Sequence, residues 1–522
     1  MTPEKPHENM SMNGWPHIFS RRAKKIFLLF FLVPFVLPLS PAAVSAGAQS
    51  PVGMMDRVEA FTMKNGIRVL ILRRPFSPTA SFYIRFRAGA VEERNGKTGL
   101  AHLLEHMMFK GTTTIGGKNP AQERKLLRKI AKTGEALDRE IAKGPAGDKQ
   151  RRDELSKRLA GLQKEHRHWY LSNEIDRLYT EAGAVHINAS TGQDMITYHV
   201  SLPANKAELW ARIEADRLAN YVLREFYQER EVVREERRQR IDADPDGLLY
   251  ERFAAAAFLV HPYRRPVIGR PEDIESLNMK DVERFHRQAK APHKMVITIV
   301  GDVKTSEMRR ILEKYFGVLH PRPETASPIP KEPTATAERR ITIPFDAGER
   351  LIMGFLKPPP PAREDYVFDV IASLLSRDRT SRFYRYLVED KGLAESVQAV
   401  NGMPGSRYPN LFCVFASVRR PHRIEELVVA VEESLNQLAA EPVPEAELNK
   451  VKKQLQVDFI RRLNTNEGIA GQLSYFETLL GDYRYLIDYA DRIAGVTPAE
   501  VRAAARNFFN RDRRTLAIMV KE

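Results

Sequence analysis

Short runs of alternating hydrophobicity and longer runs with a helical period divide the chain into strands and helices. Residues 81–88 alternate apolar and more polar side chains, which predicts a half-buried strand. Residues 59–73 predict a hairpin whose tight turn is Asn65-Gly66. Further strands are predicted at 184–190, 196–202 and 295–300, and helices at 206–220 and 225–242.

A second set of elements follows residues 321–338, a stretch rich in Pro, Thr and Ala that predicts a linker. Strands are predicted at 340–343, 350–355, 396–401 and 410–418, and helices at 365–375, 421–438 and 444–464. This order resembles that of the first half and indicates a diverged internal duplication. We therefore expect an α+β fold of two related halves, residues 47–320 and 339–522, each a mainly antiparallel sheet packed with helices.

Residues 118–170 differ in character from the rest of the first half. Dense Lys, Arg and Glu residues surround leucines and isoleucines at helical spacing, and Gly144-Pro145-Ala146-Gly147 interrupts the pattern. This predicts a charged αα-hairpin that is inserted into the first domain and projects from it. A surface-interaction role for the hairpin stays open.

Residues 1–46 have the layout of a secretory signal peptide. Four cations at 21–25 precede a 14-residue apolar stretch at 26–39, and Val44-Ser45-Ala46 fits a cleavage site. The apolar stretch is short for a bilayer, so no stable membrane span is expected, although a retained anchor is the alternative. Cys413 is the one cysteine, which excludes the small disulfide-stapled class and is compatible with export to a bacterial periplasm.

The chain carries a formal net charge of +15, with both signs scattered through most of its length. A solvated surface explains most of this charge, and attraction to acidic peptides or to an anionic membrane surface stays open. No nucleic-acid partner is expected, because the basic residues are not interleaved with aromatic ones.

The segment His102-Leu103-Leu104-Glu105-His106 is the strongest chemical signal in the sequence. Positions i and i+4 of a helix lie on one face, so His102 and His106 can hold one metal ion, and Glu105 lies beside them. This is the inverted zincin order, in which the carboxylate acts on a water. Satisfied core histidines are the alternative interpretation.

A catalytic zinc needs a third protein ligand and leaves one position for water. In the predicted helix at 225–242, Glu229, Val232, Val233 and Glu236 occupy positions i, i+3, i+4 and i+7. We expect this face to point inward because it carries the apolar residues. Glu236 is therefore a candidate ligand, unless it pairs with one of the many arginines nearby.

Together, His102 to His106 and Glu229 to Glu236 resemble the pitrilysin family of zinc metallopeptidases, which includes insulysin and the mitochondrial processing peptidase. The resemblance implies one Zn²⁺ per chain bound by His102, His106 and Glu236, with Glu229 supporting the site. It also implies that the segment Ile187 to Thr191 holds the peptide substrate by edge-strand hydrogen bonds. The substrate-binding residues expected from this match are Asn188, Ala189 and Ser190.

The chain departs from the family pattern in two places. Residues 107–235 separate His106 from Glu236, more than is common in the family, and removal of the hairpin at 118–170 restores a usual separation. Val388 and Glu395 stand where active relatives have an Arg and a Tyr. The resemblance therefore implies a hetero- or homodimer with a second family subunit, and in a heterodimer that subunit can supply the Arg and Tyr.

These observations lead to two hypotheses. The first is a zinc endopeptidase acting on short or unfolded polypeptides, in which Glu105 is the general base toward a metal-activated water and later protonates the leaving amine. The second is a non-catalytic scaffold or peptide-binding subunit with the same fold. The intact set of metal-binding side chains favours the first.

Overall fold

The computed structural model describes residues 53–54, 56–321, 323 and 328–522. The expected signal peptide at 1–46 lies outside these residues, as do residues 322 and 324–327 near the start of the expected linker. No helix in the described part of the chain is long and apolar enough to cross a membrane.

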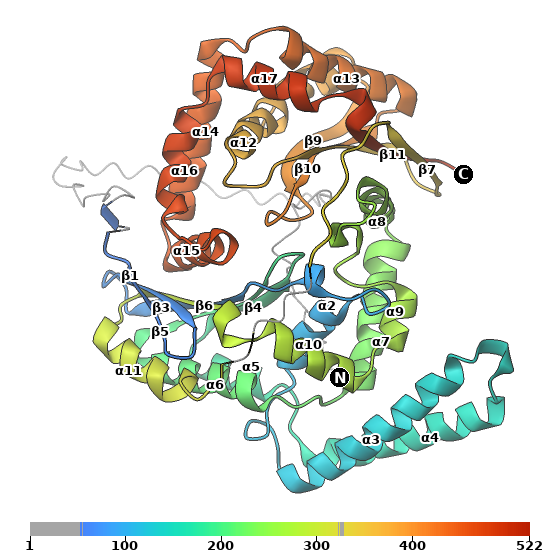
Figure 1. Cartoon of the computed structure of the whole chain (residues 1–522), viewed down its shortest axis with the longest axis vertical. Helices are drawn as coiled ribbons and strands as arrows, with labels where there is room; N and C mark the ends of the chain where they lie inside the picture. The colour runs from blue at the N-terminus through green and yellow to red at the C-terminus, as the bar shows by residue number, and fades with distance from the viewer. Residues whose placement is uncertain (1–52, 55, 322, 324–327) are drawn as a thin grey trace, which may run out of the picture.

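The first half contains a six-stranded sheet in the order β1-β2-β6-β3-β5-β4 (Figure 1). All neighbouring strands are antiparallel except the parallel pair β2 and β6. The hairpin predicted around Asn65-Gly66 is present, with Gly66 at φ +94° in the turn. The strands are β1 (Glu59–Thr62), β2 (Arg68–Arg73), β3 (Thr79–Phe86), β4 (Val185–Thr191), β5 (Ile196–Pro203) and β6 (Met295–Gly301).

The second half contains a five-stranded sheet in the order β7-β11-β8-β10-β9, with one parallel pair, β7 and β11. This order repeats β2-β6-β3-β5-β4 strand for strand, including the position of the parallel pair. The two halves are therefore related, as the sequence predicts. The strands are β7 (Arg339–Pro344), β8 (Arg350–Lys357), β9 (Ala394–Met403), β10 (Asn410–Val418) and β11 (Arg514–Val520).

Helices flank both sheets, and the inserted pair α3 and α4 projects from the body as the predicted hairpin (Figure 1). In the first half the helices are α2 (Leu100–Met108), α3 (Pro120–Ile141), α4 (Lys149–His166), α5 (Glu174–Glu181), α6 (Ala207–Asn220), α7 (Phe226–Arg237), α8 (Pro245–Ala257), α9 (Pro271–Ser276), α10 (Met279–Ala289) and α11 (Thr305–Phe316). In the second half they are α12 (Arg363–Ser376), α13 (Ile424–Ala440), α14 (Glu445–Arg462), α15 (Asn466–Leu480), α16 (Tyr485–Ala494) and α17 (Pro498–Phe508).

Each half contributes one helix that packs on the sheet of the other half. Helix α15 packs on β3 and β6 of the first sheet, and α8 packs on β7, β8 and β11 of the second (Figure 1). A Cβ added at Gly354 of β8 would lie 2.4 Å from the ring of Phe253 in α8, so this contact is close. Two hydrophobic clusters consequently contain residues from both expected domains, and the linker at 321–338 divides the sequence without separating their cores.

The strand expected at 81–88 is present as β3, but the expectation that one of its faces is exposed is wrong. All residues of β3 from Ala80 to Ile84 are buried, on both faces of the sheet. The side that alternation assigns to solvent is covered by α15, where Ile469 and Leu473 pack in one cluster with Tyr83. A sheet with helices on both faces buries both sets of side chains.

Candidate metal centre

Helix α2 is short and almost entirely buried because it is enclosed by α7, α10 and β4. It begins after Gly99, whose φ of +88° and close approach to the carbonyl of Ile268 leave no room for a Cβ. Glu93 accepts hydrogen bonds from the backbone N–H groups of Gly99 and Ala101, which caps this end of the helix. The position of α2 is therefore fixed before any ion is considered.

Within α2, His102 and His106 are one turn apart, with ring centroids 4.8 Å from each other. Glu236 is the penultimate residue of α7, with one carboxylate oxygen 3.6 Å from Nε2 of each histidine. The ligand atoms of these three residues all lie within 4.8 Å of one another, and no other such group occurs in the described part of the chain.

The donor set and its spacing fit a zinc ion. Two imidazole nitrogens and one carboxylate oxygen are common zinc donors, with bonds of about 2.0–2.2 Å. Tetrahedral ligands at that distance are about 3.3–3.5 Å apart, close to the 3.6 Å between each Nε2 and the Glu236 oxygen. The Glu236 oxygen that faces the histidines is also distinct from the one that contacts Arg240 at 3.0 Å. The arginine pairing and the metal-ligand interpretation, alternatives in the sequence, are therefore compatible in the structure.

Glu229 supports His106 from the side opposite Glu236. Its carboxylate lies 3.3 Å from Nδ1 of His106, and Lys110 forms an ion pair with its other oxygen. Burial raises the pKa of Glu229, but the hydrogen bonds from His106 and Lys110 outweigh burial and lower it. An ionised Glu229 keeps the proton of His106 on Nδ1 and leaves Nε2 free to bind a cation.

Glu105 is 8% exposed and lies on the same helix as the two histidines. Burial is the largest effect on its carboxyl and raises its pKa, while a hydrogen bond from the Thr191 hydroxyl acts in the opposite direction. A carboxyl with a raised pKa holds a proton more readily than an ordinary one, which suits a group that accepts a proton and later returns it.

Helix α7 is oriented differently from the expectation in one respect. Its buried side chains include Phe226, Arg230, Val233 and Arg237, while Val232 is 49% exposed. Placing Val232 on the inward face is therefore wrong, because the buried stripe runs through 226, 230, 233 and 237. Glu229 and Glu236 lie at the margin of this stripe, where a carboxylate can reach the histidines and still contact solvent.

The expected substrate residues lie on the edge strand of the first sheet. Asn188, Ala189 and Ser190 pair with β5 on one side, and no strand pairs with the other side of β4 among the described residues. Thr191, which holds Glu105, is the last residue of the same strand. The side of β4 that faces away from β5 therefore leads directly to the candidate base.

Three polar residues of the centre were not predicted from the sequence. Thr191 contacts Glu105, Lys110 contacts Glu229, and Arg240 contacts Glu236. Arg240 could have been found, because it lies four residues after Glu236 on a helix. The other two contacts join segments that are 86 or more residues apart and leave no local signal.

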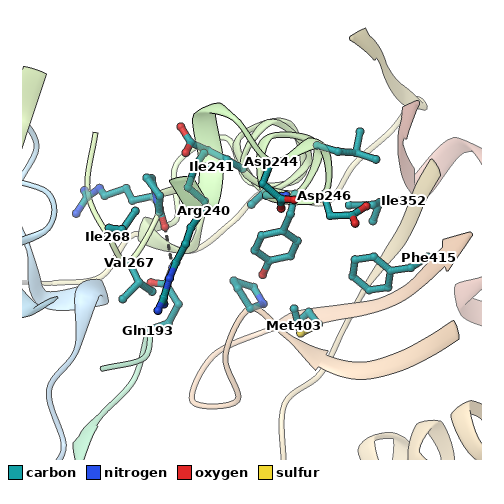
Figure 2. A pocket seen from close by; sticks show the side chains of 18 of the residues that line it. Gln193, Arg240, Ile241, Asp244, Asp246, Val267, Ile268, Ile352, Met403 and Phe415 are labelled. Atoms are coloured by element: carbon teal, nitrogen blue, oxygen red, sulfur yellow. Dashed lines mark hydrogen bonds between the residues drawn. The ribbon is translucent and has the colours of Figure 1, made fainter. Parts of the chain in front are cut away.

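A cavity of about 680 Å³ opens beside His102 between the two halves. In Figure 2, Gln193, Arg240 and Ile241 of the first half face Met403, Ile352 and Phe415 of the second half. The junction is held by Asp194, which accepts hydrogen bonds from the Tyr263 hydroxyl and from the backbone N–H groups of Ser406 and Arg407.

Comparison with known proteins identifies the family. The profile "Insulinase (Peptidase family M16)" matches residues 68–139, which include His102 to His106, and the profile "Peptidase M16 inactive domain" matches residues 276–455. The chain belongs to peptidase family M16, the pitrilysin family. The resemblance seen in the sequence is thereby confirmed.

Similar M16 proteins cover nearly the whole chain. Zinc protease PqqE from Helicobacter pylori is 26% identical over 474 residues, which are 90% of this chain and 93% of that protein. The crystal structure of a protease from Helicobacter pylori has the same fold, with a TM-score of 0.74 and 24% identity over 89% of this chain and 99% of the other. The periplasmic protease PqqL from Escherichia coli aligns over 89% of this chain and 48% of its own, with a TM-score of 0.65 and 14% identity.

Proposed function

We propose that this M16 chain is a zinc-dependent endopeptidase that hydrolyses short or unfolded polypeptides. The observation that carries the proposal is the convergence of His102, His106 and Glu236, from two distant segments, beside the buried carboxyl of Glu105. Relatives of similar length that are named zinc proteases support peptidase chemistry at this site.

The reaction follows from the positions of the side chains. A zinc ion held by His102, His106 and Glu236 would supply Lewis-acid activation of water. Glu105 accepts the proton of the attacking water and delivers it to the amine that leaves when the peptide bond breaks. Thr191 holds the Glu105 carboxylate in place, and Glu229 holds the ring of His106.

The substrate backbone adds as a further strand beside β4, on the side away from β5 and next to Asn188, Ala189 and Ser190, where alternate residues direct their main-chain groups outward. Main-chain pairing depends little on side-chain identity and requires an extended chain, so short or unfolded polypeptides fit better than folded proteins. The cavity beside His102 has a mostly apolar wall and can accept an apolar side chain of the substrate.

The proposal includes a second family subunit. Val388 is buried in the second core and Glu395 lies on β9, at the positions where the resemblance noted in the sequence implies an Arg and a Tyr. A heterodimer with a subunit carrying an Arg and a Tyr at these positions would supply them, whereas a homodimer would pair two copies that both carry Val388 and Glu395. Peptidase activity measured across a size-exclusion profile tests this, and full activity of a monomer contradicts it.

Export to a periplasm is also part of the proposal. It is supported by the sequence of residues 1–46 and by the fold shared with a periplasmic protease. Fractionation of cells and N-terminal sequencing of the mature protein test it, and an intact N-terminus in the cytoplasmic fraction contradicts it.

A non-catalytic scaffold is the second candidate function. The profile over residues 276–455 is named for an inactive domain, and helix α12, which occupies the place of α2 in the second half, carries no histidine. This observation concerns the second half only, and the first half retains Glu105 together with the three metal-binding side chains.

One experiment separates the two functions. The purified wild-type protein is expected to bind one zinc ion per chain and to cleave an unstructured peptide, with cleavage abolished by a chelator and restored by zinc. Glu105→Gln is expected to retain zinc and to lose turnover, because the general base is gone. Zinc binding without cleavage by the wild type at any assembly state, or equal cleavage by the variant, contradicts the proposed mechanism.

A further inference from the structure

The projecting hairpin carries an uneven share of the charge of the protein. Residues 118–170 contain 15 Lys and Arg and eight Asp and Glu, so they contribute +7 to a net charge of +15. In the structure, several acidic residues of the hairpin contact the body of the protein, and most of its cations lie on the exposed surface.

Acidic residues of the hairpin serve its attachment. Glu123 is buried and accepts charge-assisted hydrogen bonds from Arg224 of the body, with Nε at 2.6 Å, and lies 3.1 Å from His166 of α4. Arg224 is itself fully buried. This cluster fixes the base of both helices of the hairpin.

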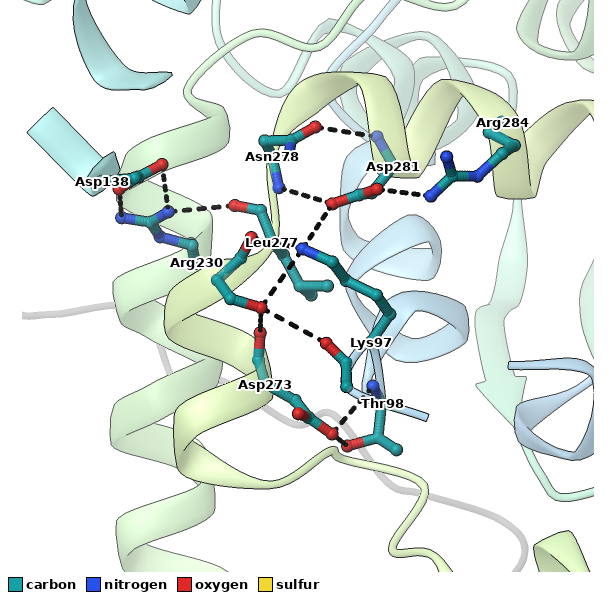
Figure 3. A network of polar contacts seen from close by, with 11 residues as sticks. Lys97, Thr98, Asp138, Arg230, Asp273, Leu277, Asn278, Asp281 and Arg284 are labelled. Atoms are coloured by element: carbon teal, nitrogen blue, oxygen red, sulfur yellow. Dashed lines mark hydrogen bonds and ion pairs between the residues drawn. The ribbon is translucent and has the colours of Figure 1, made fainter. Parts of the chain in front are cut away.

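A second attachment lies further along α3. Asp138 forms a two-pronged ion pair with Arg230 of α7, which also donates to the backbone carbonyl of Leu277 (Figure 3). Glu135 pairs with Lys280 at 2.9 Å. These acidic residues contact cations of the body, so they do not neutralise the cations of the hairpin itself.

The cations of the hairpin face solvent. On α3, six of them are exposed and form no ion pair with any described residue: Arg124, Lys125, Arg128, Lys129, Lys132 and Arg139. Exposed cations also follow α4, where only Arg151 has an acidic partner in the described part of the chain. With 22 residues, α3 extends this cationic surface over about 33 Å.

The far end of the hairpin is apolar between cations. Ile141 is 46% exposed at the end of α3, and Ala142, Pro145 and Ala146 are exposed in the turn that follows. Lys143, which pairs with Glu140, lies within this turn, and Lys149 follows it. Exposed apolar residues bordered by Lys and Arg are typical of segments that enter the headgroup region of a bilayer.

We propose that the hairpin docks the protein on a lipid surface rich in anionic phospholipid headgroups. A row of flexible cations without a pocket matches a surface of mobile negative charges, where each Lys or Arg adds to the attraction. An acidic polypeptide offers no apolar layer to the exposed apolar residues at the tip, whereas a lipid interface does. Docking through the hairpin is independent of the peptidase reaction, since its cations lie outside the metal centre.

The test uses the full chain and two variants with equal loss of charge. The hairpin variant replaces the six α3 cations by Gln. The control variant replaces six exposed cations elsewhere that form no ion pair with a described residue: Lys64, Arg94, Arg310, Lys331, Lys453 and Arg513. Each variant lowers the formal charge by six, from +15 to +9. Binding is measured by co-sedimentation with phosphatidylcholine vesicles, with and without phosphatidylglycerol, at about 0.1 M salt.

The wild type and the control variant are expected to bind the phosphatidylglycerol vesicles, and the hairpin variant at least tenfold more weakly. High salt should release the wild type. Only the difference between the two vesicle types counts, because an apolar leader would insert into both. Equal binding by the two variants, no binding by the wild type, or binding to polyglutamate without binding to vesicles overturns the proposal. Retained zinc content and thermal unfolding of the hairpin variant show that its fold is intact.

Discussion

At the scale of single residues, two carboxylates of one helical segment differ in what they can do for a metal ion. Glu236 faces Nε2 of both histidines, while Glu229 contacts Nδ1 of His106 from the other side. The first position is that of a ligand and the second that of a support for a ligand. The same substitution at both positions should therefore have unequal effects.

Glu229→Gln is expected to lower zinc affinity about 10- to 100-fold, the usual cost of losing a residue that orients a ligand. Glu236→Gln should lower it further, because a ligand is lost. Competition with a chromogenic chelator measures both affinities. A larger loss from Glu229→Gln would reverse the assigned roles.

Thr191 offers a test of how Glu105 is held. Thr191→Val removes the hydroxyl that donates to the Glu105 carboxylate and keeps the side-chain volume. A hydrogen bond to a charged group contributes about 1.5–3 kcal/mol, so kcat should fall roughly tenfold or more with zinc content unchanged. Thr191→Ser should retain most of the activity. Equal kcat for all three proteins would remove Thr191 from the mechanism.

At the scale of elements, the hairpin and helix α7 form one unit. Tyr227 and Arg230 of α7 contact Gly134 and Asp138 of α3. Helix α7 also carries Glu236 near its C-terminal end. A Cβ added at Gly134 would lie 2.0 Å from the Tyr227 ring, whereas a Cβ at Gly161 of α4 meets nothing within 4 Å. Two glycines in one hairpin are thus present for different reasons.

Gly134→Ala is expected to lower the free energy of unfolding by about 1–3 kcal/mol, because it forces α3 away from α7. Gly161→Ala should raise it by about 0.5–1 kcal/mol, since alanine favours an exposed helix interior. Urea unfolding followed by circular dichroism measures both. The same sign for the two substitutions would contradict the close packing of α3 on α7.

At the scale of the whole molecule, the two halves are joined by a buried aromatic contact. His261 is buried, accepts a hydrogen bond from the N–H of Tyr263, and has its ring 5.0 Å from that of Tyr408 in the second half. Burial is the main cause that lowers the pKa of His261 to about 4, so the ring is neutral in the folded protein at neutral pH. The junction should therefore weaken in acid.

The direction of the pH effect on stability follows from the pKa values of His261 in the folded and unfolded chain. In the unfolded chain His261 takes up a proton near its ordinary pKa of about 6.5, whereas in the folded protein it does so only near 4. Its contribution to stability is present above about pH 6.5 and is lost as the pH falls toward 4, by up to about 3 kcal/mol. His261→Asn keeps an acceptor for Tyr263 and removes the titrating group. Urea unfolding at pH 4.5 and 7.5 should show a smaller acid loss for this variant, and an unchanged loss would contradict the prediction.

The fold could be predicted as far as local pattern determines it. Strands β4, β5 and β6, the hairpin of β1 and β2, and the pair α3 and α4 follow from hydrophobic period and turn residues. The burial of β3 could not be predicted, because the helix that covers it, α15, is nearly 400 residues away in sequence. The hydrophobic pattern of α15 shows that one face is buried but not which strand that face contacts. The outward position of Val232 was missed for a related reason, since period alone did not locate the centre of the buried stripe.

The sequence by itself determined that His102, Glu105 and His106 share one helical face, because residues three and four apart on a helix are neighbours whatever surrounds it. It also determined the repeated order of strands and the charged hairpin. Only the tertiary structure decided that Glu236 reaches both histidines, that Thr191 holds Glu105, and that α15 and α8 cross between the halves. These contacts join segments remote in sequence. Their geometry depends on how the helices and sheets pack, which the local hydrophobic periodicity does not specify.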